Sequence, residues 1–171
     1  MAGIDESRAF VAVNIAVLTV SDTRALAEDK SGQTLVERIA AAGHRLAGRS
    51  IVKDETAAIT AQLRSWIADP EIDVVIATGG TGLTGRDVTP EAFRAVYEKE
   101  IEGFGELFRM LSYQEIASGA MLSRATAGVA ANKLIFALPG SPAAVELALS
   151  RLILPELPHA LGQLRPRPAA Q

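Results

Sequence analysis

The sequence predicts an α/β protein in which a mainly parallel sheet is covered by helices. Three segments, residues 11–20, 72–77 and 133–138, are short apolar runs, which are typical of strands buried on both faces. Segments with the helical spacing of apolar residues separate these runs along the chain. Strands that alternate with helices pair in parallel, so their carboxyl ends lie along one edge of the sheet. We expect a ligand site at that edge.

The first strand, residues 11–20, ends at the pair Ser21–Asp22. Ser31 is expected to cap the helix that follows, and Gly43 is expected to end it, because glycine readily adopts the backbone conformation found after a helix. Residues 45–54 are a weaker candidate strand, since an internal glycine disfavours a strand.

The second helix should begin at Thr56 and stop before Pro70. Its apolar side chains share one helical face. The residues on that face are Ile59, Leu63, Trp66 and Ile67. The strand 72–77 follows it.

The third helix should begin at Thr89–Glu91, where a capping hydroxyl, a proline and an acid form a start signal. Residues 91–117 are expected to be mostly helical, with breaks near Gly103 and Gly105. Its apolar residues Phe104, Leu107, Phe108 and Leu111 are at helical spacing, and they could serve the core or a subunit interface. Residues 117–132 show no assignable pattern.

The last strand, residues 133–138, leads through Pro139–Pro142 into a helix that Pro155 should end. This strand-turn-proline-helix design repeats the design of residues 74–91, and residues 16–32 form a looser third version. Three loops are therefore expected to line one site. We expect one domain over residues 1–171, with about residues 1–10 and 163–171 flexible.

Composition excludes several classes of protein. The net charge is −3, and no dense run of Lys and Arg suggests a nucleic-acid surface. Cysteine is absent, which excludes disulfides and thiolate metal sites. No apolar run approaches the length of about 18 residues expected of a membrane helix, and the first residues lack the apolar core of a signal peptide. We therefore expect a cytoplasmic protein that binds neither nucleic acid nor membrane.

Four glycines, at positions 79, 80, 82 and 85, lie in one loop. Such a loop can aim backbone N–H groups at a phosphate, although a parallel sheet also needs glycine turns for geometry alone. Standard motifs fit poorly. The dinucleotide motif would start a helix inside the loop, whereas the helix start is delayed to Thr89. The Walker A motif would have Lys and Ser or Thr where Arg86 and Asp87 stand.

A carboxylate beside a phosphate repels it unless a cation lies between them, and Mg²⁺ is the usual cation. Asp87 is therefore the first candidate metal ligand, and Asp54 is the second, with a helix-cap role as its alternative. Asp22 could be a third acid of the site at the same edge or a turn residue at the strand end. Arg86, Arg124 and Lys133 could pair with phosphates or carry solvated surface charge. His44 and His159 are expected at the surface, and Ser141 as a helix cap.

Five motifs resemble the MoaB/MogA family of molybdenum cofactor biosynthesis, which includes the G domains of gephyrin and of a related plant protein. The motifs are TVSDTR, TGGTGLTGRDVTPEA, EIEGFGELFRMLS, SRATAGV and LPGSP, in order between residues 14 and 154. The third and fourth motifs place the chain nearer the MoaB branch. The resemblance implies a three-layer αβα fold, a homo-oligomer that is a trimer or hexamer, and contact with other molybdenum cofactor enzymes.

The resemblance also implies an activity, the Mg²⁺- and ATP-dependent adenylylation of molybdopterin, with pyrophosphate as the second product. Asp54 and Asp87 match the essential acids of the family. Its substrate-binding loops match Ser21, Asp22, Gly79, Gly80, Thr81, Gly82, Ser123, Pro139, Gly140, Ser141 and Pro142. A phosphate nucleophile is already ionised near neutral pH, with a second pKa of about 6, so the lack of a Ser-His-Asp arrangement fits. The alternatives are a non-catalytic molybdopterin carrier and a dinucleotide-dependent oxidoreductase.

Overall fold

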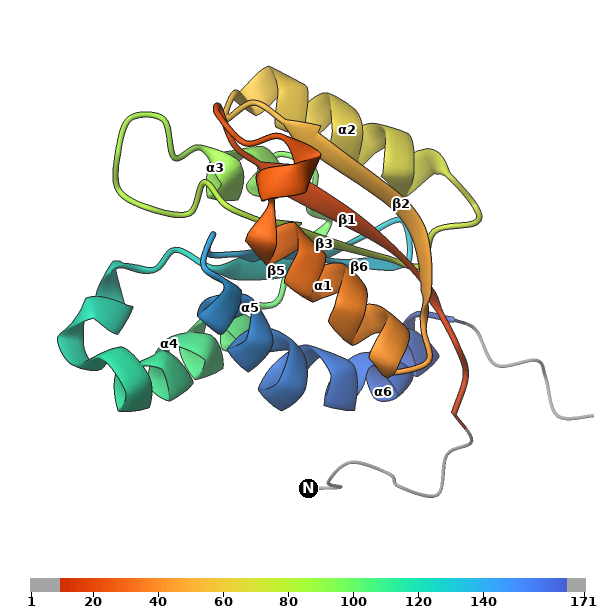
Figure 1. The fold of residues 1–171 in the computed structure, drawn as a ribbon. Helices are drawn as coiled ribbons and strands as arrows, with labels where there is room; N and C mark the ends of the chain where they lie inside the picture. Colours follow the sequence, from red (N-terminus) through yellow and green to blue (C-terminus); the bar gives the residue numbers. More distant parts are fainter. Residues whose placement is uncertain (1–9, 166–171) are drawn as a thin grey trace, which may run out of the picture.

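The computed structural model describes residues 10–165 and contains one six-stranded sheet (Figure 1). The strand order is β2-β1-β3-β6-β5-β4. Four strands are parallel: β1 (Asn14–Val20), β2 (Arg45–Val52), β3 (Val74–Thr78) and β6 (Lys133–Leu138). At the other edge, β5 (Thr126–Ala130) and β4 (Lys99–Glu100) are antiparallel to their neighbours. The predicted mainly parallel sheet is confirmed.

Helices cover both faces of the sheet, as a three-layer fold requires (Figure 1). Strand β1 shows why, because Ile15 and Val17 belong to one core and Ala16 and Leu18 to the other. The first core packs against α1 (Lys30–Ala41), α4 (Glu102–Ile116), α5 (Pro142–Ala148) and α6 (Leu154–Leu164). The second packs against α2 (Thr56–Ala68) and α3 (Thr89–Arg94).

Two helix ends differ from the prediction. Helix α1 is capped by Asp29, whose carboxylate accepts a hydrogen bond from the Gly32 N–H at 2.9 Å, and Ser31 lies inside the helix. The last helical region does not end at Pro155. A π-helical segment, Leu149–Ile153, continues without a break into α6, which contains both Pro155 and Pro158.

The predicted break at Gly103 and Gly105 is also wrong. Both glycines lie inside α4, and the chain leaves the helical conformation earlier, between α3 and α4, where it forms β4. Gly105 serves packing instead, since a Cβ there would lie 2.8 Å from the Ala125 carbonyl oxygen. A 3₁₀ helix, Ala117–Leu122, then leads into β5 through the segment with no assignable pattern.

His44, expected at the surface, and Lys133, expected to pair with a phosphate or to carry surface charge, are both buried at the end of the sheet away from the strands' carboxyl ends. His44 Nδ1 lies 3.3 Å from the Val13 N–H, which donates to it, and burial lowers the pKa of His44. Lys133 Nζ donates to the carbonyl groups of Asp69 and Ile72. Lys133 therefore cannot pair with a phosphate at the predicted edge, whereas the His159 side chain is 43% exposed and lies at the surface as expected.

The predicted flexible ends fall mostly on residues 1–9 and 166–171, which lie outside the described residues, and residues 163 and 164 belong to α6. Within residues 10–165, none of the helices has the length and apolar character needed to cross a membrane.

Candidate ligand-binding cleft

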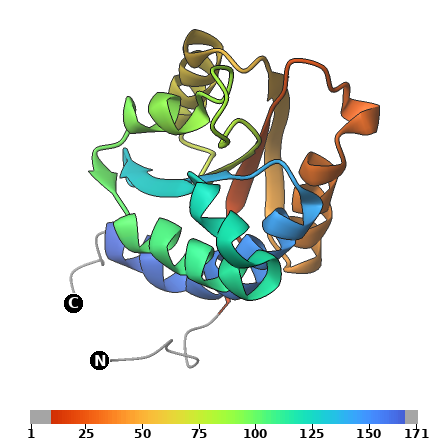
Figure 2. The same ribbon diagram turned by 90° about the vertical axis from the view of Figure 1, so that its left-hand side faces the viewer.

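A cleft of about 590 Å³ opens at the carboxyl ends of β1, β3 and β6, the edge seen face-on in Figure 2. Its walls come from the three predicted loops and from helix α4. Most of the predicted site residues line it: Ser21, Asp22, Asp54, Gly79, Gly80, Thr81, Gly82, Asp87, Ser123, Pro139, Gly140 and Ser141. Arg86, Arg124 and Pro142 are predicted site residues that do not line it.

Residues 79–88, called here the glycine loop, connect β3 to α3. Gly79 has a φ of +102°, and a Cβ there would lie 2.3 Å from the Val20 carbonyl oxygen. Gly80 has a φ of +66°, and a Cβ would lie 2.2 Å from Thr89 Oγ1 and 2.9 Å from both Asp54 carboxylate oxygens. Only glycine fits either position without strain. The first two glycines of the loop are thus required by the fold itself.

Asp54 is buried beneath Gly80, with an exposed fraction of 8%. Its Oδ1 accepts a hydrogen bond from the Val88 N–H at 3.1 Å. Burial raises the pKa of the Asp54 carboxyl, the Val88 hydrogen bond opposes the rise, and the nearby carboxylates of Asp87 and Asp22 add to it. Asp54 is therefore a carboxylate whose negative charge is disfavoured by its burial and by its acidic neighbours.

Asp87 has the opposite environment within the glycine loop. Its Oδ2 accepts hydrogen bonds from the Thr84 hydroxyl at 2.6 Å and from the Thr84 N–H at 2.9 Å. These bonds, with a further one from the Gly82 N–H and the charge of Arg124, lower the pKa of the Asp87 carboxyl. Asp87 is thus held ionised next to Asp54, and their two charges repel unless a cation lies between them.

Arg86 pairs with Asp22 rather than lining the cleft. Its Nε and Nη2 donate to the two Asp22 carboxylate oxygens at 2.9 and 2.8 Å. The hydrogen bond from Arg86 lowers the pKa of Asp22, and the Asp54 N–H also donates to Asp22 at 3.1 Å. This ion pair joins the loop after β1 to the glycine loop.

Residues 139–141, called here the proline loop, connect β6 to α5. The Ser141 Oγ accepts a hydrogen bond from the Ala144 N–H at 3.2 Å, which confirms Ser141 as the cap of α5. The Pro139 carbonyl accepts a hydrogen bond from the Thr78 hydroxyl at 2.9 Å. Since Thr78 ends β3, this bond ties the proline loop to the start of the glycine loop.

Sequence reasoning missed two parts of the cleft. Arg24 is the only basic residue among those that line it, and its guanidinium donates to the Ser31 hydroxyl at 3.3 Å and to the Gly140 carbonyl at 3.5 Å. The other part is a wall from α4 and the 3₁₀ helix: Phe108, Ser112, Ile116, Gly119 and Leu122. Arg24 could have been predicted as a cleft residue from its position in the TVSDTR motif.

The donor set fits a cation that takes most of its ligands from a substrate. Within residues 10–165, no three His, Cys, Asp or Glu side chains are grouped so that they could hold a metal ion alone. Asp54 and Asp87 supply two carboxylates on one cleft wall, and Mg²⁺ is commonly bound by one or two carboxylates together with phosphate oxygens and water. An α/β protein with this cleft is suited to a phosphorylated ligand.

Comparison with known proteins shows the family to which this chain belongs. The family model described as a probable molybdopterin binding domain matches residues 16–159. Molybdenum cofactor biosynthesis protein B of Staphylococcus aureus is 53% identical over 155 residues, which cover 89% of this chain and 92% of that protein. The protein of the same name from Bacillus cereus is 49% identical over 153 residues, covering 89% of this chain and 90% of that protein.

A crystal structure of molybdenum cofactor biosynthesis protein B has a TM-score of 0.89 and 49% identity, covering 92% of this chain and 98% of that chain. The chain therefore belongs to the molybdopterin-binding domain family, in its MoaB branch of molybdenum cofactor biosynthesis proteins. The predicted resemblance and the three-layer fold are confirmed.

Proposed function

We propose that the protein transfers an adenylyl group from MgATP to molybdopterin. An oxygen of the terminal phosphate of molybdopterin attacks the α-phosphorus of ATP and forms a new P–O bond. The bond between the α-phosphorus and the bridging oxygen to the β-phosphate breaks, and its electron pair leaves with pyrophosphate. The products are adenylyl-molybdopterin and pyrophosphate.

The observation that carries the proposal is the convergence of Asp54 and Asp87 on a glycine loop in one cleft. Asp87 is held ionised, whereas burial and neighbouring charge disfavour the ionised form of Asp54. A cation bound between them would relieve their repulsion. Mg²⁺, held by these two residues, would supply neutralisation of the charge on the reacting phosphates.

The other residues of the cleft suit the positioning of two anionic substrates. Backbone N–H groups of the glycine loop can face phosphate oxygens, and Arg24 adds a positive charge. Phe108, Ile116 and Leu122 offer an apolar wall for the pterin ring. The attacking phosphate is ionised at neutral pH, so the residues need to orient it rather than deprotonate it.

The test is pyrophosphate release from MgATP, measured with and without molybdopterin. We expect release that depends on molybdopterin and falls at least about 100-fold in Asp87→Asn and Asp54→Asn, the usual cost of removing an electrostatic contact to the transition state. Asp69→Asn is the matched control, because Asp69 lies after α2 at the opposite edge of the sheet, and it should keep the wild-type rate.

The same assay separates the proposal from a carrier function. A folded wild-type protein that binds molybdopterin but releases no pyrophosphate would contradict adenylyl transfer. It would leave a pterin-binding protein of the same pathway. If removal of Mg²⁺ did not change the affinity for molybdopterin, this would also favour a carrier function over adenylyl transfer.

We also propose that the protein is a homo-oligomer, a trimer or a hexamer. Apolar side chains are exposed along α4 and the 3₁₀ helix after it. Those that do not line the cleft are Leu107, Met110, Tyr113 and Met121. A subunit interface would remove this apolar surface from water. Light scattering should give a mass of three or six chains, and a monomer would contradict the proposal.

A further inference from the structure

The Arg124 side chain lies behind the glycine loop and contacts its carbonyl groups. Nε donates to the Gly82 carbonyl at 2.9 Å and Nη2 donates to the Asp87 carbonyl at 2.5 Å. The Arg124 backbone N–H donates to the Thr81 carbonyl at 3.3 Å. The side chain lines a neighbouring cavity of about 410 Å³ instead of the cleft. Arg124 therefore faces the back of the loop, and its donors already have acceptors.

Peptide geometry connects these carbonyl groups to the two acids. The C=O and N–H of a trans peptide unit point in opposite directions. In the unit between Asp87 and Val88, the C=O accepts a hydrogen bond from Arg124 Nη2. The N–H of the same unit donates a hydrogen bond to Asp54 Oδ1 at 3.1 Å. Arg124 thus reaches the Asp54 carboxylate through one rigid unit.

A second peptide unit connects Arg124 to Asp87. In the unit between Thr81 and Gly82, the C=O accepts a hydrogen bond from the Arg124 backbone N–H, and Gly82 lies against the Asp87 carboxylate, since a Cβ on Gly82 would be 2.8 Å from Asp87 Oδ2. The contact of Arg124 Nη2 with the Asp87 carbonyl also fixes the backbone that carries this carboxylate. Both candidate metal ligands are therefore oriented from one arginine.

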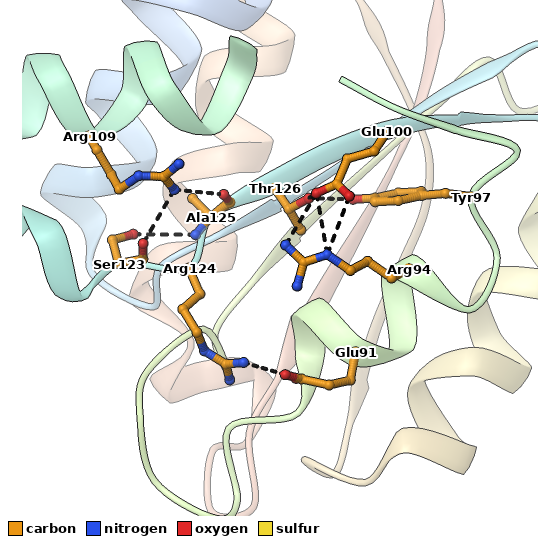
Figure 3. A network of polar contacts seen from close by, with 9 residues as sticks. All are labelled: Glu91, Arg94, Tyr97, Glu100, Arg109, Ser123, Arg124, Ala125 and Thr126. Atoms are coloured by element: carbon orange, nitrogen blue, oxygen red, sulfur yellow. Dashed lines mark hydrogen bonds and ion pairs between the residues drawn. The ribbon is translucent and has the colours of Figure 1, made fainter. Parts of the chain in front are cut away.

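Arg124 is itself fixed from two helices (Figure 3). Glu91 of α3 accepts a hydrogen bond from Arg124 Nη1. Although burial alone would raise the pKa of Glu91, the Arg124 contact leaves it lowered, so Glu91 keeps its charge. Arg109 of α4 donates to the carbonyl groups of Ser123 and Ala125, at 3.4 Å each, on either side of Arg124.

We propose that Arg124 is a positioning residue, which orients the Asp54 and Asp87 carboxylates through peptide units of the glycine loop and does not contact substrate. This assignment replaces the sequence-based expectation that Arg124 binds a phosphate. The role of the two acids as Mg²⁺ ligands rests on the proposed adenylyl transfer, whereas the orientation of the peptide units does not.

The test compares Arg124→Lys with two variants of the same network. A lysine keeps the positive charge but replaces the two nitrogens of the planar guanidinium, which donate to the Gly82 and Asp87 carbonyl groups, with one flexible ammonium that does not fix the directions of both. Arg94→Lys is the matched control, because Arg94 bonds the Glu100 carboxylate and does not contact the glycine loop (Figure 3). Glu91→Gln weakens one support of Arg124, because it removes the negative charge and keeps an acceptor oxygen, and it leaves both carbonyl contacts in place.

Amide hydrogen exchange of the ligand-free protein is the first readout. We expect exchange of the Val88 N–H to rise by about tenfold in Arg124→Lys and to stay within about twofold of wild type in Arg94→Lys. The Ala144 N–H, bonded to Ser141 in the proline loop, should not change in any variant. An unchanged Val88 rate in Arg124→Lys, or an equal rise at Ala144, would overturn the proposal.

Pyrophosphate release is the second readout. In Arg124→Lys we expect kcat to fall by about tenfold and the Mg²⁺ concentration for half-maximal activity to rise, while KM for molybdopterin changes by less than about threefold. Glu91→Gln should give a smaller fall than Arg124→Lys. A tenfold rise in KM with unchanged kcat would show a direct contact with substrate and overturn the positioning role. Should wild type release no pyrophosphate, adenylyl transfer fails, and the exchange rates still decide the role of Arg124.

Discussion

The glycine loop and the proline loop have the same design in sequence and are held in different ways. Each follows a buried parallel strand and leads through a proline into a helix. The proline loop is closed by the Ser141 cap of α5, and its carbonyl groups also accept one bond each from Thr78 and Arg24. The glycine loop is held by Asp54 and Arg124, which come from other parts of the chain. A shared local pattern therefore identifies where both loops lie but not what supports them.

Substitution of one glycine in each loop should give the largest difference between them. In Gly79→Ala, a Cβ would lie 2.3 Å from the Val20 carbonyl oxygen at a φ of +102°. We expect the free energy of unfolding to fall by about 3 kcal/mol or more, from overpacking and backbone strain together. Urea denaturation measures this change, and a substantially smaller fall in Gly79→Ala would contradict the described backbone.

Gly140→Ala is the matched variant in the proline loop. A Cβ there would meet Gly79 Cα at 3.4 Å, an ordinary van der Waals distance. We expect a change below about 1 kcal/mol. Equal losses in the two variants would remove the contrast between the loops.

The pH dependence of stability should separate the two acids that hold the glycine loop. The pKa of Asp87 is lowered in the folded protein, so its contribution is present above the ordinary Asp pKa of 3.8 and is lost as pH falls through the folded pKa. The pKa of Asp54 is raised, so its charge destabilises the fold above the folded pKa, and this penalty disappears as pH falls toward 3.8.

Asparagine variants test directly whether Asp87 and Asp54 contribute to the free energy of unfolding with opposite signs. At pH 7 in the absence of ligands, Asp87→Asn should lower the free energy of unfolding by about 1 kcal/mol, because an amide accepts the loop hydrogen bonds more weakly. Asp54→Asn should raise it above that of wild type. Both differences should shrink as pH falls to 3.8 and below. Loss of stability at pH 7 in Asp54→Asn would contradict the assigned environment of that carboxyl.

The two hydroxyls at the helix starts sharpen the comparison further. Ser141→Ala should cost about 1 kcal/mol, the usual value for a lost helix cap. The Thr89 hydroxyl is buried and has no hydrogen-bond partner among the described residues, and α3 begins without a side-chain cap. Thr89→Val should therefore leave the free energy of unfolding unchanged or raise it slightly. Thermal unfolding of both variants measures this, and a clear loss in Thr89→Val would mean that the hydroxyl has a partner in solution.

The same contrast explains what the sequence could predict. Strands β1, β3 and β6 are continuous apolar runs, so their positions and the edge where they end follow from local composition. The positions of the acids Asp22, Asp54 and Asp87 at that edge can also be predicted, because these residues are close in sequence to strand ends or glycines. The cleft lining was therefore largely predictable.

The supports of the loops depend on contacts between distant residues. Asp29 and Ser31 are both good helix caps, and Asp29 is fixed by the hydroxyl of Thr19 on β1 and the guanidinium of Arg49 on β2. Strand β5 is built from small residues and contains Gly128, where a Cβ would lie 2.4 Å from the Tyr97 ring. Neither the identity of the α1 cap nor the position of β5 can be predicted from the spacing of residues along the chain. For the same reason, the sequence around Arg124 does not indicate that its side chain contacts carbonyl groups of the glycine loop.

The smallest expected effect concerns the other tie of the glycine loop, the ion pair of Arg86 with Asp22. The Arg86 side chain is 58% exposed and that of Asp22 is 36% exposed, so water and salt screen their attraction. Arg86→Gln should lower the free energy of unfolding by less than about 0.5 kcal/mol, and the difference from wild type should vanish at 1 M salt. Arg124→Gln, by contrast, should cost more and depend less on salt, because Arg124 bonds backbone carbonyl groups at 2.9 and 2.5 Å in addition to its ion pair with Glu91. Equal costs in the two variants would mean that the glycine loop is held by net charge and not by the direction of its peptide units.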